Sequence, residues 1–321
     1  MSAQSPRVAI GVLLHNHASH LREALESLVI QTHQDFGLVL VDDASTDETP
    51  ALAREYAALD PRISYHRNES RLGYLANWDR ALELALRLHP QAQYYACASD
   101  HDVWHPRWLA VLLAEMERHP EAVLAYPWNL RITGTGEEFR PPWSFDTGNA
   151  VKPLARFRLT FRGMSAGNMV YGLFRVNELL ASGGFRRVLM PDRLLLCELA
   201  LRGPLRQVRE ILWFRRYGGL LDLERQQTAF FPGGAPGYTR VPWWITHVAA
   251  LGWQLGVRGA GRPGVSRWTG IRAACSYLAL SLDRELWRSV KLLRKALRRA
   301  LDRAAKVRRK RRLAGAAMAK P

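Results

Sequence analysis

The stretch VLLHNHASHLREALESLVIQTHQDFGLVLVDDASTDET, residues 12–49, contains two apolar runs separated by an amphipathic segment. The first run, Val8–Leu14, begins just before it and predicts a buried strand. Between residues 21 and 29 the apolar side chains recur at helical spacing, which predicts a helix. The second run, residues 36–41, is again apolar and rich in branched side chains. The stretch therefore predicts a strand, a helix and a second strand.

The alternation of strand and helix continues along the chain. We predict strands at residues 63–66, 94–98, 122–126 and 207–217. Helices are predicted at 75–88, 108–116 and 194–201, and a further helix runs through Leu52 and Tyr56. Ser19 and the segment 45–47 are expected to cap the first two helices, because short oxygen side chains accept hydrogen bonds from free backbone N–H groups. This order predicts an α/β fold with a mostly parallel sheet and helices on both faces.

Acidic residues follow two of the predicted strands. Asp42 and Asp43 end the second strand, and Asp100-His101-Asp102 follows the fourth. In such sheets ligands bind beyond the carboxyl ends of the strands, so both groups are expected to face one crevice.

Side chains of an extended segment alternate between its two sides. We therefore expect Asp100 and Asp102 to point the same way and His101 to point elsewhere. Two carboxylates suit Mg²⁺ or Mn²⁺, with positions left for phosphate oxygens. Taken alone, such a triplet is more often a solvated acidic loop.

Four segments follow one another along the chain: residues 12–49, NESRLGYLANWDRALELA (68–85), SDHDVWHPRWL (99–109) and LMPDRLLLCELALRG (189–203). Together they resemble family 2 glycosyltransferases, which have the Rossmann-like GT-A fold. The resemblance extends from about residue 8 to residue 217. It implies an inverting, metal-dependent transferase that uses a UDP-, GDP- or dTDP-sugar and a glycan or lipid-linked acceptor in cell-surface glycan, cell-wall or glycolipid synthesis.

The resemblance also assigns the donor side of the site. Asp42 or Asp43 is expected to bind the base or the ribose, which agrees with the ability of a carboxylate to accept from N–H and O–H groups. Asp100 and Asp102 are expected to hold the cation and the diphosphate. The remaining donor residues are the loop Leu14, His15 and Asn16 against the base, with His15 in place of the family's stacking tyrosine, and Arg71, which is equally well explained as a solvated loop arginine.

On the acceptor side, Asp192 matches the position of the family's catalytic base. Its alternative role is the N-cap of the helix at 194–201, and both roles can coexist at a helix N-terminus. The family's neighbouring Glu is Pro191 here, so Asp192 stands alone. Arg215 and Arg216 match a position near the donor phosphates, and a surface arginine pair is the alternative. Because the Gln-x-x-Arg-Trp motif is missing, we expect one sugar per encounter rather than processive synthesis.

Three further patterns are weaker. His15, His17 and His20 cluster, but their spacing does not fit a zinc site. Residues 259–264 match GxGxxG literally, although they follow no predicted strand, and a linker is the better interpretation. Trp243 and Trp244 are more often core residues than a sugar-stacking platform.

The composition is that of a folded protein of enzyme size, with 321 residues, 48% hydrophobic and 23% charged. Three distant cysteines do not suggest a disulfide framework and favour a reducing, cytoplasmic compartment. We expect no signal peptide, because the N-terminus lacks its pattern, and no membrane span, because apolar runs stay below 18 residues.

We predict a glycosyltransferase domain at 1–225, a linker and helical segment at 226–280, and a basic tail at 281–321.

The tail holds most of the positive charge. Residues 281–321 contain 15 Lys and Arg and 3 Asp and Glu, so +12 of the total +17 lies there. From residue 286 apolar side chains recur at helical spacing among basic ones, which predicts a basic amphipathic helix at the anionic inner face of a membrane. A helix packed on the domain and RNA binding are the alternatives. Two other functions remain open for the protein as a whole. One is a non-catalytic protein that binds a nucleotide or glycan, and the other is an RNA-binding protein that uses the basic tail.

Overall fold

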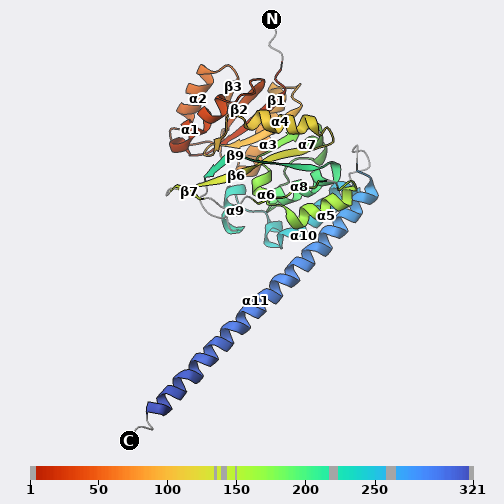
Figure 1. The fold of residues 1–321 in the computed structure, drawn as a ribbon. Helices are drawn as coiled ribbons and strands as arrows, with labels where there is room; N and C mark the ends of the chain where they lie inside the picture. Colours follow the sequence, from red (N-terminus) through yellow and green to blue (C-terminus); the bar gives the residue numbers. More distant parts are fainter. Residues whose placement is uncertain are drawn as a thin grey trace.

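A mixed β-sheet of nine strands forms the centre of the molecule (Figure 1). This computed structural model describes residues 5–133, 136–138, 143–148, 150–216, 223–257 and 265–317. The strands are β1 (Val8–Leu14), β2 (Phe36–Asp42), β3 (Ile63–Arg67), β4 (Tyr94–Ser99), β5 (Val103–Trp104), β6 (Leu124–Thr133), β7 (Gly136–Glu138), β8 (Leu173–Arg175) and β9 (Leu205–Arg216).

The helices follow the strands in the predicted order. They are α1 (Ala18–Val29), α2 (Thr49–Leu59), α3 (Tyr74–Leu88), α4 (Trp108–Arg118), α5 (Pro153–Gly163), α6 (Ala166–Met169), α7 (Val176–Ser182), α8 (Pro191–Arg202), α9 (Leu223–Phe230), α10 (Trp243–Leu251) and α11 (Arg267–Ala317). A 3₁₀ turn, η1 (Gly237–Arg240), precedes α10, and a π-helical segment, η2 (Gly252–Val257), follows it.

The first four strands in the order β3-β2-β1-β4 are parallel. In their register Leu14 of β1 lies opposite Asp42 of β2, and Leu13 lies opposite Ser99 of β4. The carboxyl ends of β2 and β4 therefore flank the end of β1. This register brings the two acidic segments to one edge of the sheet, as the sequence predicts.

The second half of the sheet departs from the predicted parallel arrangement. β8 is antiparallel to both β4 and β6, β9 is parallel to β6, and β5 is antiparallel to β9. The predicted α/β fold is confirmed, but the sheet as a whole is mixed. The pairing of β5 with β9 places Trp104 opposite Trp213. It therefore joins the segment that follows Asp100-His101-Asp102 to β9.

Side chains of β1 alternate between two buried clusters, one on each face of the sheet. Val8, Ile10, Val12 and Leu14 pack with α1 and α4, whereas Ala9 and Leu13 pack with α3 and α8. This period of two is what an extended strand with both faces covered requires. Each fully buried Leu, Ile or Val side chain contributes roughly 1.5–3 kcal/mol, so the two layers hold the strand ends in place.

The predicted cap at Ser19 is wrong. α1 begins at Ala18, and Ser19 lies inside it. The carboxylate of Asp47 instead accepts from the backbone N–H of Ala18 at 3.0 Å and from that of Thr49, the first residue of α2, at 3.0 Å. One acidic side chain in the loop after β2 therefore serves the N-termini of two helices, which fits the preference of that end for negative charge.

Residues after the sheet pack against it before the last helix leaves the body. His247 of α10 lies within 2.7 Å of the Leu189 carbonyl and 2.6 Å of the Tyr277 hydroxyl of α11. Burial lowers the pKa of His247 to about 4, so this bridge is made by the neutral ring. Phe230, Leu251 and Tyr277 belong to the same buried cluster as α3 and α8. The boundary at residue 225 stays a prediction.

The long helix α11 runs away from the body as a single rod (Figure 1). In its first part the side chains of Ala273, Tyr277 and Ser281 are buried against the body. The next residue, Leu282, is 51% exposed. Within the described ranges, no helix is both long enough and apolar enough to cross a membrane.

Cys97 and Cys197 are buried and Cys275 is exposed. The GxGxxG match at 259–264 lies outside the described residues.

Candidate active site

Backbone strain marks the edge where β1, β2 and β4 end. Among the described residues, positive φ angles at non-glycine positions occur at Asn16 (56°), Ala44 (58°) and Met190 (53°). Such conformations cost of order 1–3 kcal/mol and cluster at functional sites. Asn16 follows β1, Ala44 follows Asp43, and Met190 precedes Asp192 by two residues. The strain therefore surrounds the residues that the sequence selects.

Asp43 organises the loop that follows β3. Its carboxylate is 3% exposed and accepts from the backbone N–H groups of Leu72 at 2.7 Å and Gly73 at 2.9 Å. The Asn68 amide donates to the same carboxylate at 3.1 Å. Arg71 lies on this loop and is exposed. Asp43 thus fixes the path of the segment that carries Arg71.

Asp42 is fully buried at the end of β2. The Tyr65 hydroxyl donates to it at 2.7 Å, the Ser45 N–H at 2.9 Å, and the Arg67 guanidinium lies 3.3 Å away. The loop after β1 is attached to the same region, because Asn16 Oδ1 accepts from the Thr46 N–H at 2.8 Å. His15 is half-buried, and its Nδ1 lies 3.0 Å from the Asp43 carbonyl. The 14–16 loop and the segment from Asp42 to Thr46 are therefore hydrogen-bonded to each other and form one wall of the candidate site.

Asp100 lies in the centre of a cluster of histidines. Its Oδ2 accepts from the His15 N–H at 2.8 Å, and its Oδ1 lies 2.8 Å from His17 Nδ1 and 2.7 Å from His101 Nδ1. Burial alone would raise the pKa of Asp100, but the hydrogen bonds of His101 and His17 outweigh it and lower that pKa. The hydrogen bond to Asp100 in turn raises the pKa of His17. The carboxylate is thus held in its charged form.

Asp102 faces β9. Its Oδ2 accepts from Trp213 Nε1–H at 2.9 Å, and its Oδ1 accepts from the Arg216 N–H at 2.8 Å. The guanidinium of Arg216 donates to the His101 carbonyl at 2.6 Å and pairs with Glu23. Asp102 and Arg216 therefore fasten the triplet to β9.

The predicted orientation of His101 is wrong. β4 ends at Ser99 and the chain bends at Asp100 and His101, so the alternation of an extended strand stops before the triplet. The His101 ring lies between the two carboxylates, with Nδ1 2.7 Å from Asp100 and Nε2 3.9 Å from Asp102. His101 is therefore part of the acidic centre.

Asp192 and Arg215 meet at a glycine. A Cβ placed on Gly167 would lie 3.8 Å from Arg215 Nη2 and 3.9 Å from Asp192 Oδ2. Arg215 Nη1 also donates to Asn168 Oδ1 at 2.8 Å. Asp192 is the second residue of α8, and its Oδ1 accepts from the Arg193 N–H at 2.9 Å. Burial raises the pKa of Asp192, and the hydrogen bond from Arg193 opposes this shift only in part.

Aromatic side chains connect the Asp192 side with the Asp102 side. The Arg215 guanidinium lies 5.4 Å from the centre of the Trp213 ring, and Trp213 donates to Asp102. The Tyr171 ring lies 4.8 Å from the Trp213 ring, and the Tyr171 hydroxyl is 3.1 Å from that of Tyr74. Burial raises the pKa of both tyrosines, so both stay protonated near neutral pH.

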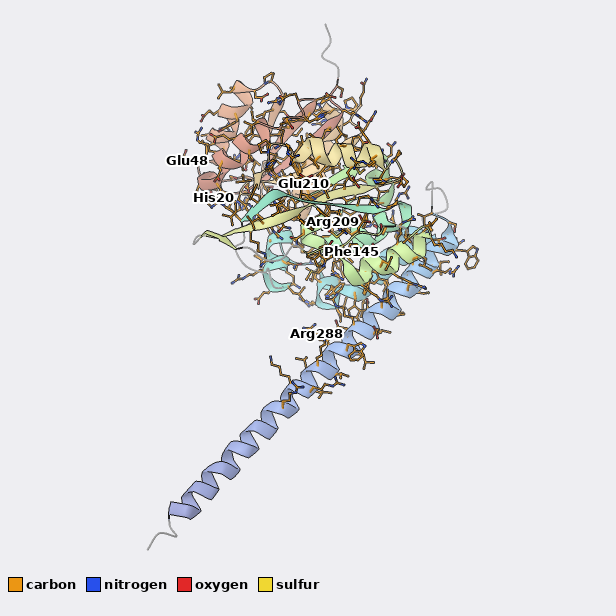
Figure 2. All side chains as sticks on the ribbon, viewed as in Figure 1. His20, Glu48, Phe145, Arg209, Glu210 and Arg288 are labelled. Atoms are coloured by element: carbon orange, nitrogen blue, oxygen red, sulfur yellow. The ribbon has the colours of Figure 1, made fainter. Side chains whose placement is uncertain are left out.

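Sequence reasoning did not select Tyr74, Tyr171 and Trp213. Buried aromatic residues have no local pattern that separates them from the core, and only the pairing of β5 with β9 brings Trp213 to the triplet. The structure also contains a groove of about 670 Å³ between α4 and β9, lined by residues such as Arg107, Glu115 and Glu210. Figure 2 labels Arg209 and Glu210, which belong to its rim. None of the predicted site residues lines this groove.

Comparison with known proteins adds independent findings. The family described as "Glycosyl transferase family 2" matches residues 9–176, which is more than half of the chain. The chain is 31% identical over 132 residues to the putative glycosyltransferase EpsE of Bacillus subtilis and 28% identical over 141 residues to an uncharacterized glycosyltransferase of Methanocaldococcus jannaschii. These matches cover 41% and 42% of this chain but 43% and 47% of the relatives. The chain thus spans less than half the length of these curated relatives.

Solved structures share the fold. Residues 1–349 of S. aureus TarS, in complex with UDP-GlcNAc, superpose with a TM-score of 0.58 at 13% identity, covering 85% of this chain and 71% of that one. The mannosyltransferase PcManGT from Pyrobaculum calidifontis, in complex with GDP-Man and Mn²⁺, gives a TM-score of 0.51 at 16% identity, covering 90% and 80%. With the family match over residues 9–176, the chain belongs to glycosyl transferase family 2.

Proposed function

We propose that this chain transfers a single sugar, with inversion, from a nucleoside-diphosphate sugar to a hydroxyl group of an acceptor. The observation that carries the proposal is the pairing of two carboxylate centres: Asp100 among three histidines, and Asp192 beside Arg215 at Gly167. Trp213 contacts both sides, through Asp102 and through Arg215. An inverting transfer requires a donor centre and a separate carboxylate that can act as a base toward the acceptor hydroxyl.

The donor is proposed to lie along the wall made by the 14–16 loop and the Asp42-Asp43 segment. His15 offers a half-buried ring for the base, and the exposed Arg71 is held nearby by Asp43. Binding of the base or ribose by Asp42 or Asp43 themselves stays a prediction, because their oxygens already accept hydrogen bonds from Tyr65, Leu72 and Gly73. The neighbours' complexes with UDP-GlcNAc and GDP-Man support a nucleotide sugar as the donor class.

A divalent cation, Mg²⁺ or Mn²⁺, is proposed at Asp100. A buried carboxylate held in its charged form lies beneath two partly exposed imidazoles, a donor set that suits Mn²⁺ better than Mg²⁺. Held by these residues, a cation would supply positive charge against the charge that develops on the diphosphate leaving group. Ligation by Asp102 stays a prediction, since both of its oxygens accept hydrogen bonds from β9.

Asp192 is proposed as the base. The acceptor oxygen forms a bond to the anomeric carbon, the bond from that carbon to the diphosphate oxygen breaks, and the acceptor proton passes to the Asp192 carboxylate. The guanidinium of Arg215 lies near the same glycine as Asp192. A contact of Arg215 with the diphosphate, which leaves from the face opposite the base, stays a prediction. Arg216 is less suited, because its guanidinium already binds the His101 carbonyl and Glu23.

Consumption of donor tests this function. Incubation with UDP-GlcNAc, GDP-mannose and other nucleotide sugars in Mn²⁺ is expected to release one nucleoside diphosphate, faster when hydroxyl acceptors are present. Phosphate-coupled detection of the released diphosphate measures the rate. Binding of a nucleotide without turnover of any donor across an acceptor panel would instead favour a non-catalytic binding module.

We further propose that α11 attaches the protein to an anionic membrane surface at its cytoplasmic face. Beyond Ser281 most of the described side chains of α11 are exposed, including Leu286 at 65%, Trp287 at 54% and Leu293 at 70%. Basic residues such as Arg288 lie among them, on the part of the helix that has left the body (Figure 2). Among the described side chains, buried positions of α11 end at Ser281, and Arg284 still lies 5.9 Å from the Trp243 ring of α10. A helix that combines exposed apolar residues, including Trp, with Arg and Lys suits the headgroup region of a membrane. Binding to RNA would require only the positive charge, so the exposed apolar residues favour the membrane.

Deletion of residues 282–321 is expected to lower partition onto vesicles that contain anionic lipid by about ten-fold or more, because each basic residue near the surface adds to binding. Co-sedimentation with vesicles of neutral and of mixed anionic lipid measures this. Replacing Leu286 and Leu293 by serine keeps the charge and is the matched control. Retention on RNA, with vesicle binding unchanged by these serines, would contradict the membrane proposal.

A further inference from the structure

Three side chains with metal-binding atoms converge at the end of β4. They are His17, which precedes α1, and Asp100 and His101, which follow β4. One nitrogen or oxygen from each lies within 4.8 Å of the others, and no other group of this kind occurs among the described residues. In the sequence, His17 belongs to the group His15, His17 and His20, whose spacing does not fit a metal site. In the fold, His17 lies instead beside His101 and Asp100.

The two imidazoles point at the same oxygen. Nδ1 of His17 is 2.8 Å and Nδ1 of His101 is 2.7 Å from Asp100 Oδ1, and their ring centres are 4.6 Å apart. The other oxygen, Oδ2, is fixed by the His15 N–H at 2.8 Å. In the metal-free protein, protons on the imidazole nitrogens make these contacts. A cation that displaces those protons would find two nitrogens and one carboxylate oxygen already gathered.

The cluster is anchored on one side and open on the other. The exposed fractions of the side chains are 46% for His17, 32% for His101 and 4% for Asp100. Beneath it, Asp102 is held by Trp213, and Arg216 holds the His101 carbonyl. A site with three protein ligands and an open face leaves positions for water or for diphosphate oxygens. Backbone and side-chain contacts around the ligands limit their reorientation.

We propose that His17, Asp100 and His101 form a mixed nitrogen and oxygen cation site, which takes Mn²⁺, Co²⁺ or Zn²⁺ in preference to Mg²⁺. Imidazole nitrogen is a good ligand for first-row transition metals, whereas Mg²⁺ is bound by oxygen in proteins. Asp102 is not a direct ligand in this site. It supports the site by keeping β9 against the triplet. The role of the cation in catalysis rests on the proposed function, but its binding does not.

Metal binding without nucleotide tests the inference. Free Mn²⁺, measured by its electron paramagnetic resonance signal, and the visible absorption of bound Co²⁺ report affinity and nitrogen ligation. Mn²⁺ is expected to bind about ten-fold or more tightly than Mg²⁺, and His17→Gln and His101→Gln each to weaken Mn²⁺ by about ten-fold or more. Glutamine retains a polar contact with Asp100 but lacks the imidazole. His20→Gln, on the same helix end, is the matched control and is expected to bind Mn²⁺ like the parent protein.

Equal affinity for Mg²⁺ and Mn²⁺, or Mn²⁺ binding that survives both glutamine substitutions in proteins with unchanged thermal melting, would overturn the inference. A comparable loss in His20→Gln would do the same, because it would indicate a general effect of charge. Nucleotide titrations separate this result from the proposed function. Diphosphate binding that Mg²⁺ supports as well as Mn²⁺ leaves the function standing without the site. Mn²⁺ binding without any nucleotide binding leaves the site without the function.

Discussion

Asp192→Asn is expected to lower turnover by about 10²- to 10⁴-fold, the range that a positioned general base contributes. The amide preserves the size of the side chain and can still accept from the Arg193 N–H, so the start of α8 should remain intact. It cannot take the proton of the acceptor hydroxyl. Steady-state rates at saturating donor, together with donor affinity measured by titration, check this result. Affinity for the donor is expected to change little.

The pH profile gives a second test of the same residue. A base works when it is deprotonated, and burial raises the pKa of Asp192 above that of an ordinary aspartate. The rate is therefore expected to fall as pH decreases through this raised pKa, and the acid limb should disappear in Asp192→Asn.

Asp79 provides the matched control. Partial desolvation raises its pKa to about 6, although its side chain is exposed, and it lies on α3 rather than at the proposed site. Asp79→Asn should keep both the rate and the acid limb. A full rate in Asp192→Asn, or an acid limb that only Asp79→Asn removes, would contradict the assignment of the base.

Asp100→Asn is expected to lower the rate at limiting donor by roughly 10³-fold, because electrostatic stabilisation of a leaving group by a cation is worth several kcal/mol. The asparagine oxygen can still accept from the His15 N–H, so the loop after β1 should keep its path. The cation loses its only anionic ligand in the proposed set. Donor consumption and Mn²⁺ affinity measure the two effects, and both should fall together.

Asp102→Asn is the informative comparison. Its carboxylate accepts from Trp213 Nε1–H and from the Arg216 N–H, and hydrogen bonds to a charged group are worth about 1.5–3 kcal/mol each. This variant should therefore lower thermal stability, while it weakens Mn²⁺ binding less than Asp100→Asn does. The reverse pattern, with Asp102 dominating Mn²⁺ affinity, would favour a site made by the two aspartates.

Much of the donor side follows from the sequence. Apolar runs and helical periodicity suffice to predict β1, α1 and β2, because both faces of these strands are buried. Parallel pairing then brings Asp42 and Asp100 to one edge, since their strands flank β1. These predictions need only local patterns and one rule of topology.

The remaining features depend on contacts between distant segments. Asp47 replaces Ser19 as the helix cap because the loop after β2 folds back over the start of α1. His101 turns between the aspartates because β4 ends one residue before the triplet. Trp213 reaches Asp102 only because the two-residue strand β5 pairs with β9. None of these has a signal in its own neighbourhood of the sequence.

Binding of nucleoside diphosphates is the most direct test of the central claim that the Asp42-Asp43 segment and Asp100 flank the binding site of a nucleotide-sugar donor. Isothermal titration of the purified protein with UDP, GDP and dTDP, with and without Mn²⁺, measures it. We predict that at least one nucleotide binds, and binds more tightly with Mn²⁺ than without it. Absence of binding for all three nucleotides in both conditions would contradict the claim.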